Sequence, residues 1–213
     1  MVKETYDDII KLAKSSDLED IRLQNIIHAG LAFSGMMRLL KKDQKVTVHE
    51  KLFEFLKRLN DTQNIDSFEK MHSEFCKWGT ENVWLAEKTG KYPKPKRLIS
   101  YGQIAKTLNV VLKVAIHYAQ IPKEKKANSI RPWLHAAVDN AMMKMLKRKY
   151  KREMNNPWPE SIEQVCRDQY FQIQTFVQDF ITQNHKQPVI TAVDFDDIYW
   201  NLLNKKSTND DHK

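Results

Sequence analysis

The chain has 213 residues, of which 41% are hydrophobic and 29% are charged, with five glycines and two cysteines. This length and composition indicate one soluble globular domain, and two cysteines exclude a disulfide framework or a cysteine-rich metal knuckle. The first residues, "MVKETYDDII", lack the apolar core of a secretory signal, and no apolar run reaches the length of a membrane helix. We therefore expect a cytoplasmic protein without a membrane partner.

The net charge of +8 is unevenly distributed along the chain. Residues 88–152 contain seventeen Lys and Arg and only two acidic residues, Glu124 and Asp139, so this segment carries +15. The remaining residues contain eighteen basic and twenty-five acidic side chains and carry −7. Such asymmetry is typical of a polyanion-binding region. The simpler alternative is a basic surface that only serves solubility.

The residue usage, rich in Leu, Lys, Glu, Met and Gln and poor in β-branched alternation, predicts an all-α fold. Residues 1–204 are expected to form one domain with two lobes, followed by a disordered tail at 205–213. The helices are predicted, in chain order, at 3–14, 17–41, 47–60, 66–78, 80–88, 102–120, 139–151, 160–184 and 195–203. Loops are predicted at 89–97, 121–132 and 155–159, and an extended segment at 186–193.

The helix predicted at 102–120 has two opposite sides at 100° per residue. The apolar side is expected to pack on the core; it consists of Ile104, Leu108, Val111, Leu112, Ala115 and Ala119. The polar side is expected to face solvent or a ligand; it consists of Lys106, Asn109, Lys113, His117 and Gln120. Lys106 lies in the first turn, directly after Gly102 and the preceding loop.

Asp139 is the second residue of interest, because it is a carboxylate within the basic segment. On its helix it shares a side with Met142, Met143 and Leu146. Aspartate is a preferred N-cap residue, and position 139 is where this helix is expected to begin. A capping carboxylate is also fixed in place, so a structural and a functional role are compatible.

Two segments resemble the helix-hairpin-helix DNA glycosylases, the superfamily of endonuclease III and the 8-oxoguanine glycosylases. "ISYGQIAKTLNVVLKVA" is similar to the hairpin L-P-G-V-G-x-K-T-A and its helix, and "LHAAVDNAMMKML" is similar to A-V-D-T-H. Lys106 falls on the nucleophilic lysine, Asp139 on the catalytic aspartate and Gly102 on the first hairpin glycine. The chain departs from the pattern at Ile104, which replaces the second glycine, and at Ser100-Tyr101, which replaces Leu-Pro. The four cysteines of an iron–sulfur cluster are absent.

The resemblance implies a two-lobed helical fold of helix-hairpin-helix type and a DNA glycosylase that also acts as an AP lyase. Such an enzyme binds double-stranded DNA and extrudes the target nucleotide. A lysine attacks as the neutral amine, which neighbouring cations favour. A fixed carboxylate stabilises the sugar cation that develops as the base leaves. Neither a cofactor nor a metal is expected.

Further residues are candidates for contacts with DNA, although simple packing is the alternative for each aromatic side chain. The candidate DNA-binding residues are Tyr101, Gly102, Lys94, Lys96, Arg97, Lys113, Lys123, Lys125, Lys126, Lys147 and Arg148. A base pocket is predicted from His135, Trp133 and His117. Lys113 lies on the same side of its helix as Lys106, so it is a rival for the role of nucleophile.

Two other classes of function stay open. Arg22 and His28 fit the R-x5-H pattern of small helical RNases of defence and toxin systems, but six residues on a helix place them on different faces. A non-catalytic DNA-binding protein of the same fold would also explain the charge. Trp200 is expected in the core, and Asp196 and Asp197 are given no chemical role. Metal binding lacks ligand spacing, and the sequence does not fix the oligomeric state.

Overall fold

The computed structural model describes residues 18–87, 95–184 and 190–210, and for residues 204–210 it describes the backbone alone. The predicted helix at 3–14 lies outside the described residues. Most described residues are helical. The helices are α2 (Leu18–Ser34), α3 (Lys42–Arg58), α4 (Ile65–Asn82), α5 (Tyr101–Leu112), α6 (Glu124–Ile130), α7 (Asn140–Tyr150), α8 (Arg167–Asn184) and α9 (Ala192–Asp210). The all-α expectation is therefore confirmed.

Short elements connect these helices. A π-helix, η3 (Lys113–Tyr118), continues α5 directly. The 3-10 turns are η1 (Met36–Arg38), η2 (Leu59–Asp61), η4 (Arg131–Trp133) and η5 (Ile162–Gln164). The two strands β1 (Trp84–Leu85) and β2 (Arg97–Leu98) pair antiparallel, with Trp84 opposite Leu98. Within the described part of the chain, no helix is both long and apolar enough to cross a bilayer.

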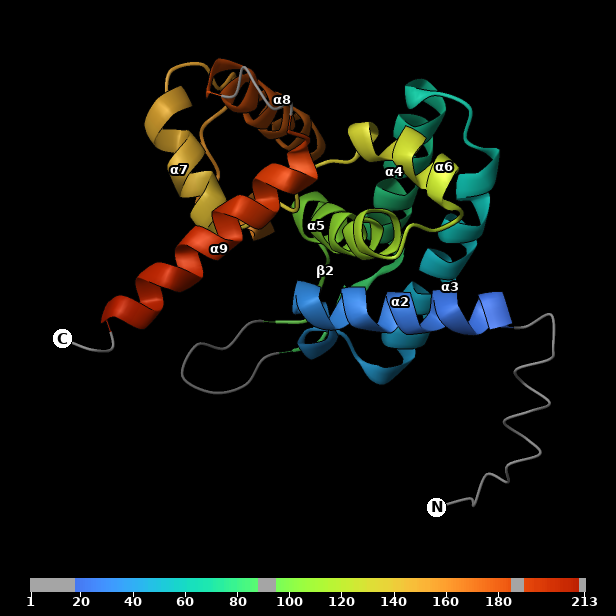
Figure 1. The fold of residues 1–213 in the computed structure, drawn as a ribbon. Coiled ribbons are helices and arrows are strands. Elements are labelled where there is room, and N and C mark those ends of the chain that lie inside the picture. The colour runs from blue at the N-terminus through green and yellow to red at the C-terminus, as the bar shows by residue number, and fades with distance from the viewer. Residues whose placement is uncertain (1–17, 88–94, 185–189, 211–213) are drawn as a thin grey trace.

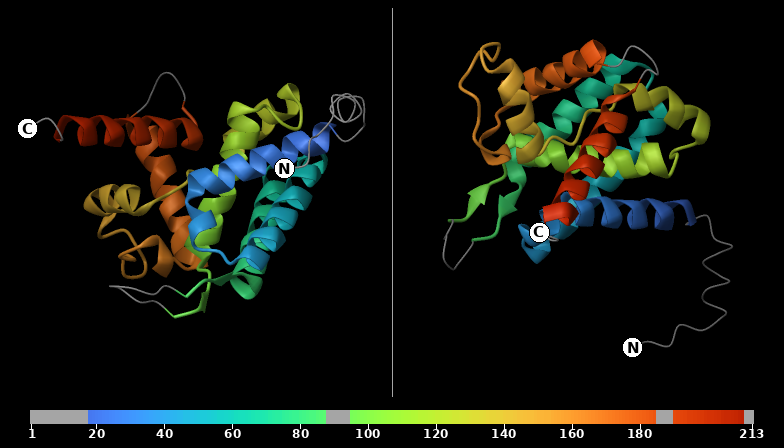
Figure 2. Two further views of the ribbon diagram at one scale, coloured as in Figure 1. Left: turned by 90° about the horizontal axis from the view of Figure 1, so that it is seen from below. Right: turned by 60° about the vertical axis from the view of Figure 1, so that its left-hand side comes forward.

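Helix α5 lies at the centre, between two groups of helices (Figures 1 and 2). Helices α2 and α4 pack on one side of α5, with α3 and α6 outside them. Helix α8 and the η5 turn pack on the other side, together with α7 and α9. Gly30 of α2 and Gly79 of α4 allow the close approach, because a Cβ would lie 2.7 Å from Val111 and 2.4 Å from Ile104. The core is therefore built around α5.

Several predicted boundaries were wrong. The helix predicted at 80–88 is instead the end of α4 followed by β1, because the backbone there has partners that hold it extended. The Trp84 N–H donates to Gln44 Oε1, and the Ala86 N–H donates to the Leu39 carbonyl. The predicted loop at 121–132 contains α6, and α8 begins at Arg167 rather than at 160. Helix α9 runs to Asp210, through the part of the predicted tail that is described.

The amphipathic reading of α5 was also wrong on its polar side. Gln103, Thr107 and Asn109 are buried, so this helix is enclosed nearly all round. Asn109 Nδ2 donates to the Ala136 carbonyl and to the Tyr170 hydroxyl, and Asn109 Oδ1 lies 2.9 Å from His72 Nε2. A polar residue predicted to face solvent is thus a hydrogen-bonding centre inside the protein.

Candidate active site

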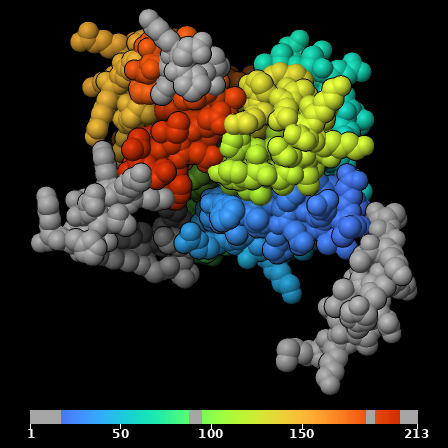
Figure 3. Space-filling model, in the orientation of Figure 1, coloured from blue at the N-terminus to red at the C-terminus, as the bar shows by residue number. Residues whose placement is uncertain are grey.

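Lys106 and Asp139 line the same cleft, on the face of the molecule where α2, α9 and η3 lie together (Figure 3). Lys106 comes from α5, and Asp139 comes from the segment that leads into α7. The cleft has a volume of about 320 Å³. Val110, Val114 and Ala137 give it an apolar wall. The structure therefore brings together the two residues that the sequence singled out, which are thirty-three positions apart.

Asp139 is held in place from two sides. It is the N-cap of α7, because its Oδ1 accepts a hydrogen bond of 2.8 Å from the Met142 N–H. The segment before it is buried and pinned by Gln174, which bonds both the N–H and the carbonyl of Ala136. The second oxygen, Asp139 Oδ2, makes no hydrogen bond to a described residue. The predicted cap is confirmed, and one carboxylate oxygen stays available to a ligand.

Lys113, the rival nucleophile, is engaged in ion pairs. Its Nζ lies 2.6 Å from Asp196 Oδ2 and 2.6 Å from Asp197 Oδ1 of α9. Burial by itself would lower the pKa of Lys113, but the two carboxylates outweigh that effect and raise the pKa above its usual value. Lys113 is therefore a charged structural lysine. Lys106 forms no ion pair with any described residue, so its amine is the one left for chemistry in the cleft.

The π-helical turn explains how one carboxylate of α9 collects several partners. The Ala119 N–H donates to the Val114 carbonyl five residues earlier, which gives a wider turn than in an α-helix. Residues five apart, such as Lys113 and Tyr118, then lie on the same face. The Tyr118 hydroxyl donates to Asp197 Oδ1 at 2.7 Å, and His117 Nε2 lies 3.4 Å from Asp197 Oδ2. These contacts fasten α9 as one wall of the cleft.

Three exposed aromatic side chains stand around the cleft. Phe33 of α2 is 73% exposed, Tyr118 of η3 is 57% exposed, and Trp200 of α9 is 56% exposed. The prediction that Trp200 lies in the core was wrong. Large aromatic side chains gathered at the mouth of a cleft are typical of a binding surface rather than of scattered surface residues.

Sequence reasoning missed Asp196, Asp197 and the aromatic residues at the cleft. The pair "DD" in "FDDIYW" was visible, but its partner Lys113 is 83 positions away in the chain. Asp196 is buried, and burial raises its pKa although Lys113 opposes that shift. No local spacing encodes a partner at that distance.

The expected contacts of Tyr101 and Gly102 with DNA are not supported by the geometry. The Gly102 N–H donates to the Val165 carbonyl at 3.1 Å, so it points into the protein. A Cβ at Gly102 would lie 2.6 Å from the Ile162 carbonyl oxygen and from Val165 Cβ, so close packing explains this glycine. Tyr101 is buried against Tyr170 and Phe171. Among the described residues, the paired strands β1 and β2 precede α5.

The basic segment does not form one continuous surface. Lys147 and Arg148 lie on α7, whereas Lys123 and Lys125 lie at the start of α6, on the opposite side of the molecule (Figure 2). Lys126 donates to the Thr62 carbonyl. The remaining candidates are at the hairpin: Lys96 stacks over Trp84 with Nζ 4.7 Å from the ring centroid, Arg97 pairs with Glu163 at 3.1 Å, and Lys94 lies outside the described residues.

The structure does not bring together the predicted base pocket. His117 contacts Asp197 beside the cleft. His135 is buried on the other side of α5, where it bonds Glu69 and the Tyr170 hydroxyl, each at 2.7 Å. Trp133 packs against Phe68 near His135. Two of the three residues are therefore separated from Lys106 by the body of α5.

The residues of the RNase pattern, Arg22 and His28, are exposed on α2, and His28 packs edge-on against His49. No ion pair or hydrogen bond joins this arginine to this histidine among the described residues. Over the same described part of the chain, no group of three His, Cys, Asp or Glu is placed to hold a metal ion. Cys76 is buried and Cys166 is exposed, and both are free thiols.

Comparisons of the chain with protein-family models, with curated proteins and with solved structures found no match. Its function is therefore inferred from the residues of the cleft and from their geometry.

Proposed function

We propose that this protein is a DNA glycosylase with AP-lyase activity, in which Lys106 is the nucleophile and Asp139 its electrostatic partner. One observation carries the proposal: an amine without an ion-pair partner among the described residues and a capped carboxylate line one cleft. The resemblance of residues 98–150 to the helix-hairpin-helix glycosylases supports the same assignment. The fold of that superfamily is part of the proposal, while the helical character alone is established.

The chemistry that we propose uses both groups. The neutral Lys106 amine attacks C1′ of the target nucleotide, the C1′–N bond to the base breaks, and the base leaves with a proton. Asp139 stabilises the positive charge that develops on the sugar and relays the proton. The lysine–C1′ adduct opens to a Schiff base. Loss of a C2′ proton and of the 3′ phosphate then breaks the strand by β-elimination.

The surroundings of the cleft suit an extruded nucleotide. A volume of about 320 Å³ is at the small end of ligand pockets, which fits one base and its sugar rather than a longer segment. Phe33, Tyr118 and Trp200 offer surfaces on which bases stack. Lys147 and Arg148 of α7 lie on the helix that Asp139 caps, so we place the DNA backbone along α7.

The test is borohydride trapping on a duplex oligonucleotide that carries one abasic site, because it requires no knowledge of the base. We expect a covalent protein–DNA band for the unmodified protein. Lys106→Arg keeps the positive charge but removes the nucleophile, so the band should disappear while DNA binding persists. Lys125→Ala, on the exposed start of α6, is the matched control and should retain the band.

A second candidate is a DNA-binding protein without catalysis. The specific observation in its favour is the basic last turn of α7, where Lys147 and Arg148 can bind phosphates without any contribution from Lys106. For this candidate, the same experiment gives no covalent band with any variant. Binding to duplex DNA that weakens steeply with salt would remain, and would be reduced by a Lys147→Ala, Arg148→Ala double variant.

A further inference from the structure

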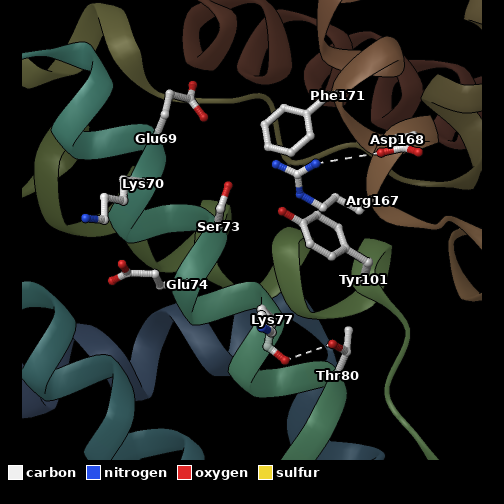
Figure 4. A pocket seen from close by; sticks show the side chains of 10 residues that line it. All are labelled: Glu69, Lys70, Ser73, Glu74, Lys77, Thr80, Tyr101, Arg167, Asp168 and Phe171. Carbon is white, nitrogen blue, oxygen red and sulfur yellow. Dashed lines mark hydrogen bonds and ion pairs between the residues drawn. The ribbon is translucent and has the colours of Figure 1, made fainter.

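A second pocket lies on the other side of α5, between α4, the start of α5 and the start of α8 (Figure 4). Its volume is about 1010 Å³, at the upper end of the range for small-molecule sites. It shares no lining residue with the cleft of Lys106 and Asp139. The proposed DNA chemistry makes no use of it.

The hydroxyl of Tyr101 points into this pocket toward Ser73 (Figure 4). Tyr101 is 7% exposed, and its hydroxyl makes no hydrogen bond of normal geometry to a described residue, although Ser73 and Cys76 approach it. Burial raises the pKa of Tyr101, so the group is a neutral phenol that can donate a hydrogen bond. A buried polar group without a partner is costly, and a ligand acceptor would remove that cost.

Glu69 supplies the complementary group, because its carboxylate is bonded on one oxygen only. His135 Nε2 donates to Glu69 Oε1 at 2.7 Å, while Glu69 Oε2 is buried and has no hydrogen-bond partner within the described part of the chain. The direction of the bonds follows from the neighbours. Asn109 Nδ2 donates to the Tyr170 oxygen, so the Tyr170 proton goes to His135 Nδ1, and His135 must donate to Glu69. Glu69 thus lines the pocket with an unsatisfied acceptor, Oε2, which a ligand donor would complete.

The outer part of the pocket offers cations with weak partners. The Arg167 guanidinium lies 5.1 Å from the centroid of the Phe171 ring, and its nearest carboxylate, Asp168, is 3.7 Å away. Lys77 is 3.9 Å from Glu81 on the same helix. Such long, exposed ion pairs contribute little, so these side chains can turn to an anion. The rings of Phe171 and Tyr101 provide aromatic surfaces between these cations and the two unpaired groups, Glu69 Oε2 and the Tyr101 hydroxyl.

We propose that this pocket binds a free nucleotide, of the size of a nucleoside monophosphate. An N–H of the base donates to Glu69 Oε2, and an adjacent acceptor of the base receives the Tyr101 proton. The base packs against Phe171, and the phosphate pairs with Arg167, which presents a planar donor fork. A ligand with only an anionic group would leave both Glu69 Oε2 and the Tyr101 hydroxyl unpaired. This proposal does not depend on the DNA chemistry of the cleft.

Calorimetric titration of the full chain with the four ribonucleoside 5′-monophosphates tests the proposal. We expect at least one of them to bind with a Kd below about 1 mM. Ribose 5-phosphate, which has no base, should bind at least about tenfold more weakly. Glu69→Gln keeps an acceptor for His135 but loses the charge, and should weaken nucleotide binding about tenfold or more. Tyr101→Phe should weaken binding about threefold to tenfold.

Two controls separate this site from the cleft and from surface charge. Lys106→Arg should leave nucleotide binding unchanged, whatever its effect on trapping with DNA. Arg167→Gln should weaken the monophosphate but not the parent nucleoside. The proposal is overturned if no monophosphate binds, if ribose 5-phosphate binds as well as the nucleotides, or if Tyr101→Phe and Glu69→Gln both bind normally. Thermal melting of each variant verifies that the fold is retained.

Discussion

The side of α5 that faces α4 and α8 carries a neutral hydrogen-bond network, whereas η3, which continues this helix, is joined to α9 by ion pairs. Asn109, His72 and Tyr170 satisfy one another without charge in the first region. Lys113, Asp196 and Asp197 neutralise one another in the second. Full burial permits only groups that stay neutral, while the partly open wall of the cleft tolerates charges that are paired. The same helix therefore supports two polar regions with different responses to mutation and pH.

The largest effect is expected from the centre of the neutral network. Asn109→Leu removes the bonds to His72, to the Ala136 carbonyl and to the Tyr170 hydroxyl, and leaves those buried groups without that partner. We expect the free energy of unfolding to fall by about 4 kcal/mol. Urea denaturation measures it, with the exposed Asn128→Ala of α6 as a control that changes stability by less than about 0.5 kcal/mol. Equal effects of both variants would contradict the central role of Asn109.

The next largest effect is expected from a variant that removes the ion pairs of Lys113. Lys113→Met leaves Asp196 and Asp197 without their shared cation, and we expect a loss of about 3 kcal/mol at neutral pH. Because the pKa of Lys113 is raised from its usual 10.5, its contribution is full below pH 10.5 and is lost as the pH rises through the raised value. The difference in unfolding free energy between the variant and the unmodified protein should therefore be smaller at pH 11 than at pH 8. An equal difference at both pH values would show that packing of the lysine stem, not its charge, matters.

A smaller effect is expected from His72 at acidic pH, and it distinguishes the neutral network from the ion pairs of Lys113. Burial, followed by the nearby His135, lowers the pKa of His72 from 6.5 to about 3, although Asn109 opposes this shift. Below pH 6.5 the unfolded chain binds a proton at His72 that the folded protein does not bind. Stability present above pH 6.5 is therefore lost as the pH falls. At pH 5 we expect a loss of about 2 kcal/mol from this histidine. For His72→Gln, the free energy of unfolding should differ less between pH 7 and pH 5 than it does for the unmodified protein. An equal difference for both proteins would refute the role of His72.

The smallest effect is expected at Tyr101. Its hydroxyl makes no hydrogen bond of normal geometry to any residue that the structure describes, so Tyr101→Phe removes a polar group and keeps the ring packed against Tyr170. We expect the melting temperature to stay the same or to rise slightly. A clear decrease would mean that the contact with Ser73 or Cys76 is a real hydrogen bond. The neutral network would then extend to the wall of the nucleotide pocket.

The features that the sequence predicted correctly are local ones. Residue usage and helical spacing indicated an all-α fold, and the preference of aspartate for helix starts located the N-cap at Asp139. The roles of Lys106 and Asp139, which were proposed from a motif, stay a prediction, although both residues line one cleft. Lys106 lies in the first turns of α5, within the segment that resembles the hairpin motif.

The features that the sequence could not predict depend on distant partners. Asn109 looked solvent-facing, because its partners His72 and Tyr170 are 37 and 61 positions away. Trp84 was predicted to be helical, because the Gln44 side chain that accepts a hydrogen bond from its N–H and holds the backbone extended is 40 positions away. Amphipathic spacing describes a helix with one covered side, and it fails for α5 because helices cover this element from both sides.

The π-helical winding at Lys113–Tyr118 is a constraint in its own right. With ordinary α-helical winding over the same residues, Lys113 and Tyr118 would lie about 140° apart around the helix axis. Tyr118 would then no longer reach Asp197 beside Lys113, and α9 would lose part of its anchorage beside the cleft. Substitutions that restore α-helical winding in this turn should therefore release α9 even when Tyr118 and Asp197 are themselves unchanged.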